Sequence, residues 1–538
     1  MAHRFARFQN RRNRAIAIIR LWSAGYRTFG QKSKGDHTLR AIDFTPPCNL
    51  KTRVLSWAGD SMDSNRRRNS PALPAMANAS RIPPAYAIAL WRWEAMKFNP
   101  ARLLAFYLGL ALVFLRFSML HELLSWLAGF RLYLLNAIGA PAILGVLLTG
   151  GVRRTYGLRP AWYWTAFFLW MIAATPLSVW KTGSAGLAFV YLKSEFPMLF
   201  VIGGLAVTWR ECRRLMHVLA ASAVFYLVVA WLFARETDAR LSMLFGTTAN
   251  PNDLAAHQLL VLPFLFFFAL DTEKPRIIRL IAAAGTCFGL YLIVATGSRG
   301  AIVALSAVCG LVLLRGSSKL RLAVLALIII GIAVLPHVVP QERYRRLLVF
   351  TPAPDAPEEA VAGMRNRQEL LASSLKITLQ HPVFGAGPGQ FMVQEDILKR
   401  AEGAYRGAWH ETHNAYTQVS SECGIPALIF FAGGIISGFR LVSKIHWQAK
   451  QNPAHQQIAA AAFCAMLSFM GFGVAMFFLS MAYRFCFPAL VGLSIAIHNT
   501  ATRELAASQA STSHSAGGSD HGKLSTASAS ASLPRSLR

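Results

Sequence analysis

The chain has 538 residues, of which 54% are hydrophobic and only 15% are charged, and its mean hydropathy is +0.38. This composition excludes an ordinary soluble globular protein and predicts a helical protein with several membrane spans. The formal net charge of +30 would suggest a nucleic-acid partner in a soluble protein, but in a membrane protein it is first tested against the positive-inside rule.

The first hundred residues differ from the rest of the chain. They hold 18 Lys and Arg against 5 Asp and Glu, and they contain no long apolar run. An apolar signal-peptide core followed by a small-residue cleavage site is also missing from this stretch. We therefore predict that residues 1–100 form a basic, disordered cytoplasmic extension that contacts anionic lipid. The alternative interpretation of this stretch is a mis-assigned start, with Met76 or Met96 expected as the first residue.

Twelve apolar segments follow, and about 20 helical residues suffice to cross a bilayer. They predict an all-α polytopic membrane protein with about 12 transmembrane helices, nine of them in residues 101–339 and three in residues 424–499. The predicted spans are 103–120, 131–150, 161–180, 186–207, 215–234, 253–270, 277–296, 300–314, 321–339, 424–442, 457–480 and 482–498.

Charges between the spans predict the orientation of the chain. With the N-terminus in the cytoplasm, each of five inside connections holds three Lys or Arg, fifteen in all, whereas the short outside connections hold six. This asymmetry favours a cytoplasmic N-terminus and, after twelve spans, a cytoplasmic C-terminus. It also explains much of the basic charge, so no nucleic acid is expected as a partner. The Ser/Ala-rich residues 500–538 are predicted to be a disordered cytoplasmic tail.

One connection is far longer than the others. Residues 340–423 carry nine Lys and Arg against ten Asp and Glu, so this loop is nearly neutral in a very basic chain. Loops of this length are usually functional or disordered. The stretch "RNRQELLASSLKITLQ" predicts an amphipathic helix, with its leucines on or near one face. We therefore expect an ordered periplasmic loop between spans 9 and 10; the leucines are Leu370, Leu371, Leu375 and Leu379.

Two polar motifs open predicted spans on the outer side. "NPND" supplies Asn250 and Asn252, and it favours a capped helix start with Pro in the first turn. "ATGSRG" makes a tight turn that leaves Arg299 at the outer interface. A snorkelling anchor is as reasonable an interpretation of this arginine as a functional role.

Three further motifs lie in the long loop. Arg365 and Arg367 open its helix, where a solvated charged face is the usual interpretation. "HPVFGAGPGQF" predicts a close glycine turn, with phosphate contact as a second interpretation. In "ETHNAYTQVSSECG", His413 precedes a helix start and is by itself more often structural than catalytic. A metal pair of His410 and His413 is disfavoured because no outer carboxylate or Cys cluster completes a site.

The order of these motifs resembles the O-antigen ligase and O-antigen polymerase family of bacterial envelope enzymes. "NPND" and "SRGA" each open a span, an Arg-led loop helix follows, and "HPVFGAGPGQF" then precedes "HNAYTQVSSECG". Arg367 lies fourteen residues before His381, and nine residues separate Asn414 from Gly424. Both intervals are similar to those of the family. The resemblance covers about residues 100–500.

This resemblance implies an inverting glycosyltransferase of the bacterial inner membrane. Its donor would be a glycan on undecaprenyl pyrophosphate, and its acceptor a hydroxyl of the lipid A core or of a second glycan, at the periplasmic face. Membrane lipids are the other expected partners. No metal, nucleotide sugar or other cofactor would take part, and the sequence contains no Asp-x-Asp pair of the kind that holds a metal in many nucleotide-sugar transferases.

The resemblance also assigns roles to single residues. His413 would act as general base or orient the acceptor, since an imidazole with a near-neutral pKa suits that task. Arg299 and Arg367 would stabilise the pyrophosphate leaving group, because Arg is always charged and binds phosphate in a bidentate manner. The other expected substrate-binding residues are Asn414, Arg365, Arg484, Asn250 and Asn252.

Several alternatives stay open at this point. A ligase and a polysaccharide polymerase of this family differ only in their acceptor, and a protein oligosaccharyltransferase is a third option. From another class, a polysaccharide flippase or other 12-span transporter would explain intramembrane charges such as Arg116, Lys193 and Glu195. A transporter should show internal repeats between its halves, and none is visible in the sequence.

Overall fold

Helices make up nearly all of the described chain, apart from one short hairpin. The computed structural model describes residues 99–237, 240–338, 341, 358–404 and 409–516. The extension predicted for residues 1–100 lies outside these residues except for its last two positions. All of the described helices belong to the compact unit that begins at Pro100.

Left-handed residues separate the first three of the five helices that begin the unit. Met119 and Tyr133 have φ angles of 54° and 50°, and they precede the second and third helices. A left-handed residue without a glycine's freedom cannot continue a helix, so the chain turns at both points. The helices are α3 (Pro100–Phe117), α4 (Leu120–Ala128), α5 (Leu134–Leu148), α6 (Gly151–Tyr156) and α7 (Arg159–Ala174).

The next apolar span contains a π turn at its centre. It consists of α8 (Lys181–Val190), the π turn η4 (Tyr191–Glu195) and α9 (Pro197–Leu205), and the 3-10 turn η3 (Thr175–Leu177) precedes it. The π turn brings Glu195 to 3.3 Å from the guanidinium of Arg116, which also donates to the carbonyl of Ser194. Each of these two buried charges therefore compensates the other, which lowers the cost of holding them inside the bundle.

A capping box starts the following helix, α10 (Trp209–Phe233). The Thr208 hydroxyl accepts the Glu211 N–H, and the Glu211 carboxylate accepts the Thr208 N–H. The same carboxylate binds the buried Arg102 at 2.7 Å, which ties α10 to α3. After α10 comes an antiparallel hairpin of β1 (Ala234–Thr237) and β2 (Arg240–Met243), in which Thr237 pairs with Arg240.

Helix α11 (Pro251–Leu270) is the central helix of the unit. It is apolar on all sides and buried along most of its length, as expected of a helix with neighbours all round. It packs against α10, α12 (Arg276–Ala295), α13 (Arg299–Arg315) and α19. Helix α14 (Ser318–Val338) packs against α13 and exposes apolar side chains such as Ile329 and Ile332.

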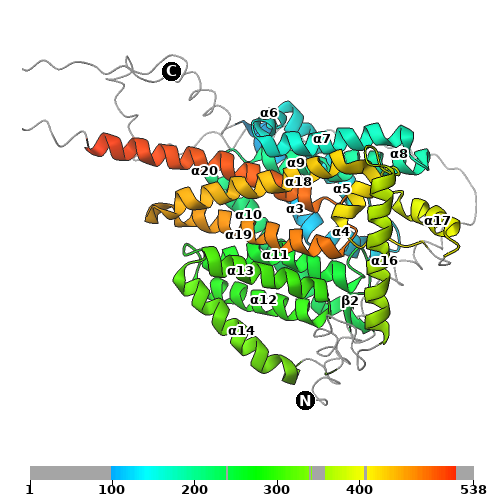
Figure 1. Cartoon of the computed structure of the whole chain (residues 1–538). Helices are drawn as coiled ribbons and strands as arrows, with labels where there is room; N and C mark the ends of the chain where they lie inside the picture. The colour runs from blue at the N-terminus through cyan, green and yellow to red at the C-terminus, as the bar shows by residue number, and fades with distance from the viewer. Residues whose placement is uncertain (1–98, 238–239, 339–340, 342–357, 405–408, 517–538) are drawn as a thin grey trace, which may run out of the picture. The chain divides into compact units, whose positions relative to one another are not determined.

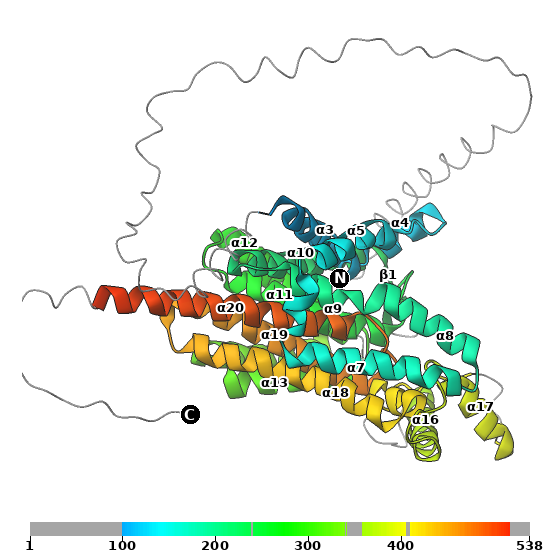
Figure 2. The same ribbon diagram turned by 90° about the horizontal axis from the view of Figure 1, so that it is seen from above.

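The last helices close the bundle and support the candidate site. They are α16 (Glu358–Gln380), α17 (Phe391–Ala401), α18 (Ala415–Lys450), α19 (Gln456–Ala475) and α20 (Cys486–Ala516), with the 3-10 turns η5 (Pro453–His455) and η6 (Met476–Phe478). Figures 1 and 2 show α18, α19 and α20 running alongside one another, whereas α16 crosses the ends of the neighbouring helices. Helix α16 therefore lies over one end of the bundle rather than within it.

Seven helices of the described chain are long and apolar enough to cross a membrane. A helix also occupies each of the twelve predicted segments. The membrane character and the helical fold expected from the sequence are thus confirmed, while the number of twelve crossings stays a prediction. The seven are Pro100–Phe117, Lys181–Leu205, Trp209–Phe233, Pro251–Leu270, Arg276–Ala295, Ala415–Lys450 and Pro453–Phe478.

Two local predictions need correction. Three of the predicted face leucines, Leu371, Leu375 and Leu379, share an exposed face of the loop helix, whereas Leu370 is fully buried. The buried face of α16 combines Leu370 and Ile377 with small polar residues, of which Thr378 bonds Ser420 of α18 at 2.9 Å. The tail predicted for residues 500–538 begins inside α20, which continues to Ala516 because its Ala-rich sequence favours helix. Residues 517–538 lie outside the described part.

Candidate active site

A basic cavity of about 200 Å³ lies where α16 crosses the starts of three helices. Three arginines and one histidine line it, and none of its described lining residues is acidic. Such a set of donors fits an anion, above all a phosphate. The lining residues are Arg240, Asn252, Gly297, Arg299, Gly363, Asn366, Arg367 and His413.

Three helix N-termini meet at this cavity. The starts of α11, α13 and α18 are capped by Asn250, Ser298 and Asn414, whose side chains accept N–H groups of the first turn. The unpaired N–H groups and the dipole of a helix start attract negative charge. The backbone therefore adds to the positive field of the arginines.

The three predicted asparagines differ in role, because two of them cap helices and one lines the basic cavity. Asn414 Oδ1 accepts the N–H groups of Tyr416 and Thr417 at 3.0 and 3.2 Å, so it holds the start of α18. Asn250 holds the start of α11 in the same way, through the N–H of Asn252. Of the two "NPND" asparagines, only Asn252 lines the basic cavity.

Arg240 is a residue of this cavity that the sequence analysis missed. It lies at the start of β2, where its guanidinium donates to Asn252 Oδ1 at 2.9 Å and to the carbonyl of Thr296 at 3.1 Å. In the sequence it is only one of the six outer-loop charges. A hairpin of two four-residue strands carries too weak a local signal to show where this side chain points.

The two arginines of the loop helix point to different sides. Arg367 lies on the side of α16 that faces the cavity, together with Gly363 and Asn366. The side chain of Arg365 is 82% exposed and pairs with Glu369 one turn along. Residues two apart on a helix are separated by about 200°, so only one of the pair can face the site. The structure therefore does not bring Arg365 to the cavity.

Arg299 is the first residue of α13 and reaches toward α16. Its guanidinium lies 3.1 Å from the sulfur of Met364, on the helix that carries Arg367. Gly300 beside it packs on Phe478, and a Cβ at this position would come within 2.6 Å of the ring. Close packing by this glycine fixes the start of α13, and with it the direction of Arg299.

His413 stands in a left-handed backbone conformation just before α18. Its φ is 51°, and its N–H donates to the hydroxyl of Ser480 at 2.8 Å. Burial lowers the pKa of the imidazole to about 4, with further lowering by the positive charge of Arg367 and by His410. His413 is therefore neutral near pH 7, which is the form that can accept a proton.

Gly424 breaks α18 ten residues after Asn414. Its φ of 84° and ψ of 174° are not helical, and a Cβ would come within 2.0 Å of the carbonyl oxygen of Val383. The indole N–H of Trp170 donates to the carbonyls of Val383 and Cys423 at 3.1 Å, so it satisfies groups exposed by the break. Residues 415–423 thus form a separate short half-helix that begins beside the cavity.

The glycine turn of residues 381–390 clamps this break rather than a ligand. Gly385, Gly387 and Gly389 all have positive φ, as expected of a close backbone turn. The N–H groups of Gly387 and Gly389 donate to the backbone and side-chain oxygens of Glu422 at 2.8 Å. The predicted phosphate contact of this turn is therefore not supported, because two of its donors are already taken.

A second cavity of about 290 Å³ adjoins the first across residues 412 and 413. Thr412 lines it and shares a 3.1 Å hydrogen bond with Ser480, the residue that also holds the N–H of His413. Its charge is opposite to that of the basic cavity, because three carboxylates and only one arginine line it. The carboxylates belong to Glu195, Glu411 and Glu422, the arginine is Arg484, and the wall also includes Tyr191, Tyr483 and Gln418.

Arg484 thus lies apart from the other predicted arginines. It lines the second cavity and a smaller one of about 50 Å³ beside α4 and α11, but not the basic cavity. Asp253 is near enough to interact electrostatically with Arg484 and also with Glu411. The charge of Arg484 is therefore partly compensated by a carboxylate.

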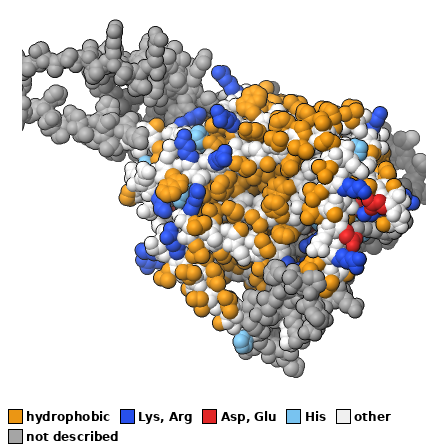
Figure 3. All heavy atoms as spheres, viewed as in Figure 1, with side chains coloured by type: hydrophobic (Ala, Val, Ile, Leu, Met, Phe, Trp, Pro, Cys, Tyr) orange, Lys and Arg blue, Asp and Glu red, His pale blue; other side chains and the backbone are white. Residues whose placement is uncertain are grey.

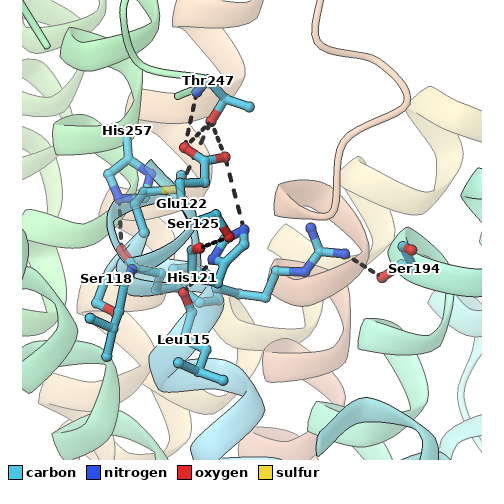
Figure 4. A network of polar contacts seen from close by, with 12 residues as sticks. Leu115, Ser118, His121, Glu122, Ser125, Ser194, Thr247 and His257 are labelled. Atoms are coloured by element: carbon cyan, nitrogen blue, oxygen red, sulfur yellow. Dashed lines mark hydrogen bonds and ion pairs between the residues drawn. The ribbon is translucent and has the colours of Figure 1, made fainter. Parts of the chain in front are cut away.

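A polar network next to these cavities holds the loop that leads to α11. Figure 4 shows the Glu122 carboxylate facing Thr247, whose N–H and hydroxyl both donate to it at 2.9 Å. Its neighbour His121 bonds the carbonyl of Leu115, and His257 of α11 bonds the carbonyl of Phe117 at 2.8 Å. These contacts fix α11, and with it Asn252, relative to α3 and α4.

The described residues contain no group of three or more His, Cys, Asp or Glu side chains arranged to hold a metal ion. The intramembrane charges that suggested a transporter have local partners: Arg116 pairs with Glu195, and Lys193 lies 5.7 Å from the centre of the Phe189 ring. These charges therefore have a structural explanation.

Comparison with known proteins bears on the segment that holds most of this site. Residues 284–432 match the O-antigen ligase family model, and this segment contains Arg299, Arg367, His413 and the Gly424 break. Arg240, Asn252 and Arg484 lie outside it. The chain matches no curated protein. Over residues 284–432, this membrane protein therefore carries a segment similar to the O-antigen ligase family.

Proposed function

We propose that this protein transfers a glycan from undecaprenyl pyrophosphate to an acceptor hydroxyl, with the lipid A core as acceptor. One observation carries the proposal. The basic cavity is surrounded by three arginines, three helix N-termini and a neutral imidazole, and its volume of about 200 Å³ leaves room for a pyrophosphate.

The leaving group explains why the arginines gather. As the bond between the anomeric carbon and the pyrophosphate oxygen breaks, the electron pair stays on that oxygen. Arg240, Arg299 and Arg367 would stabilise the growing charge, and prepositioned donors of this kind are each worth roughly 10²–10³ in rate. They supply the positive charge that a divalent cation supplies in other transferases, so we expect transfer to continue in the presence of EDTA.

His413 would remove the proton of the acceptor hydroxyl as its oxygen attacks the anomeric carbon. The new carbon–oxygen bond forms on the face opposite the departing pyrophosphate, so the configuration inverts. The proton moves to the imidazole, and the pyrophosphate beside it stabilises the resulting charge. A positioned general base contributes roughly 10²–10⁴ in rate.

The second cavity is the proposed entry for the acceptor. It adjoins His413 across Thr412, and its carboxylates, amide and tyrosines are groups that bind sugar hydroxyls and sugar faces. The buried Oε2 of Glu195 has no hydrogen-bond partner among the described residues, so it is available to a hydroxyl in this cavity. Donor phosphate and acceptor would then approach His413 from opposite sides.

The membrane placement follows from the charges of the connections. With both termini in the cytoplasm, the helix starts around the basic cavity face the periplasm of a bacterial inner membrane. The donor's lipid chain would stay among the spans while its pyrophosphate reaches the cavity. Donor, acceptor and membrane lipid are accordingly the proposed partners.

Reconstitution tests the proposal. The full-length protein is placed in liposomes with a lipid-linked glycan and a lipid A core acceptor, and product is measured over time. We expect His413→Ala and Arg299→Ala each to lose at least about 10²-fold in rate. Arg365→Ala is the matched control, since its exposed side chain should leave the rate unchanged. Full activity of the His413→Ala protein would remove this residue from the mechanism.

A polysaccharide polymerase is the second candidate, because it would use the same donor and the same chemistry with another glycan as acceptor. The glycan phenotype of a deletion strain separates the two. A ligase predicts loss of capped lipopolysaccharide while lipid-linked polymer accumulates. A polymerase predicts that only single repeat units reach the lipopolysaccharide.

A further inference from the structure

An apolar groove of about 620 Å³ lies between α18 and α19. Side chains spaced along one face of α18 and one face of α19 form its walls, and α13 reaches it with its last residue, Arg315. Ile436 and Phe439 of α18, Phe469 of α19 and Phe477 of the adjoining turn η6 line the apolar part. Figure 3 shows apolar side chains across the middle of this face of the molecule.

The groove ends among cations. Arg315, Arg440 and Lys444 line it at one end, together with Ser443 and Trp447. Arg315 donates to the hydroxyl of Ser443 at 2.5 Å, which holds its guanidinium over α18. Lys and Arg gather on the left of Figure 3, where this end of the helices lies.

These cations lack anionic partners within the described chain. None of the described lining residues is acidic, and the ion pairs recorded among the described residues include neither Arg440 nor Lys444. Cations at the end of a membrane helix, beside an apolar surface and a tryptophan, favour contact with an anionic lipid headgroup.

The size of the groove matches one leaflet of a bilayer. Residues 435–447 of α18 extend over roughly 18 Å at 1.5 Å per residue, and half of the hydrocarbon core is about 15 Å thick. An acyl chain could therefore lie along Ile435, Ile436 and Phe439 while its headgroup meets the cations. A free phosphate would leave the apolar wall without a partner. The donor's pyrophosphate belongs at the other end of α18.

We propose that this groove, formed by α18, α19 and the end of α13, binds an anionic phospholipid of the inner leaflet. Its phosphate contacts Arg315, Arg440 and Lys444, and an acyl chain lies between α18 and α19. The binding is independent of the proposed glycan transfer and of His413. The placement in the inner leaflet relies on the orientation predicted from the connecting charges.

Native mass spectrometry of the full-length protein from nanodiscs tests this site. The nanodiscs hold phosphatidylglycerol and phosphatidylethanolamine in equal amounts and with identical chains. We expect the wild type to retain phosphatidylglycerol preferentially. Each cation at a membrane surface contributes roughly fivefold in affinity for an anionic lipid. The double variant R440Q/K444Q loses two cations, so it should bind phosphatidylglycerol about 30-fold more weakly than the wild type. The matched control is R153Q/R276Q, which removes two exposed cations from other predicted inner connections and should retain the lipid like wild type.

Three outcomes would overturn the proposal. The first is equal retention of phosphatidylglycerol by R440Q/K444Q and by the control. The second is displacement of the lipid by millimolar inorganic phosphate, which would show a simple anion site. The third is displacement by an equimolar polyprenyl pyrophosphate, which would assign the groove to the donor's chain. Since the readout is lipid binding, failure of glycan transfer has no influence on it.

Discussion

The guanidinium of Arg240 donates a 2.9 Å hydrogen bond to the amide oxygen of Asn252, and this contact joins the β-hairpin to the start of α11. Both side chains line the basic cavity. Arg240 therefore belongs to the same set as Arg299 and Arg367, although it lies outside the segment that matches the O-antigen ligase family.

Replacing Arg240 by Ala should slow glycan transfer by roughly 10²-fold, because one prepositioned donor to the leaving group is lost. The measurement is the initial rate in proteoliposomes at saturating donor. Arg235→Ala is the matched control, since it removes an exposed arginine from the other strand of the same hairpin. If both variants lose the same activity, the effect belongs to the hairpin and not to the cavity.

The pH profile of transfer should reflect the low pKa of His413. In the enzyme without donor this pKa is about 4, so the rate at low substrate should stay level from pH 8 to about pH 5 and fall below that. A bound pyrophosphate favours the imidazolium, so the profile at saturating donor should fall at a higher pH.

Arg367→Ala should move the low-substrate profile in a defined direction. Removing a positive charge near the imidazole raises its pKa, so the acid limb of this profile should move to higher pH. Arg365→Ala should leave the limb in place because that side chain points away from the cavity. A limb that moves to lower pH in Arg367→Ala would contradict the proximity of the two groups.

Gly424→Ala should destabilise the protein by more than 1 kcal/mol, since a side chain in the left-handed region costs roughly 1–3 kcal/mol. The added Cβ would also clash with the carbonyl of Val383. Thermal unfolding in detergent, followed by the fluorescence of the purified protein, measures this. Gly310→Ala is the control, because open space surrounds that helical glycine and alanine favours helix. Equal melting temperatures for the two variants would show that the break tolerates a side chain.

Glu411→Gln should raise the KM for the acceptor while the KM for the donor stays unchanged. A hydrogen bond to a charged group is worth about 1.5–3 kcal/mol, so the acceptor KM should rise roughly tenfold or more. Glu402→Gln provides the control, as this carboxylate pairs with Lys376 and Lys399 on the surface of the loop. A change in the donor KM alone would contradict the assignment of Glu411 to the acceptor cavity.

Much of this arrangement could be predicted because local signals determine it. Asn250 and Ser298 precede helices that start where capping rules place them, and the glycine turn has the positive φ angles that its sequence indicates. The gathering of Arg299, Arg367 and His413 in one cavity was expected only from the resemblance to a family. No spacing in a single sequence fixes contacts between helices that are more than 60 residues apart.

The errors have separate physical causes. Arg365 could have been set aside, because helical geometry directs it away from Arg367. The buried side of α16 could not be chosen from its leucines, because it combines Leu370 and Ile377 with Ser and Thr side chains that pack against α18, while the other leucines are exposed. Arg240 lies in a short hairpin and Arg484 in a connecting segment. In such segments the hydrophobic periodicity of a helix or a strand does not indicate where a side chain points.

The break at Gly424 gives the two halves of α18 different attachments. The outer half is bonded to α16 and to the glycine turn, whereas the long half packs along α7 and α19. A span adapts to a thicker or thinner bilayer by tilting, and a left-handed glycine between the halves can absorb that change of direction. His413 would then keep its distance from the arginines while the span tilts. We therefore expect the break at Gly424 to separate the orientation of the half-helix at the site from the tilt of the long half.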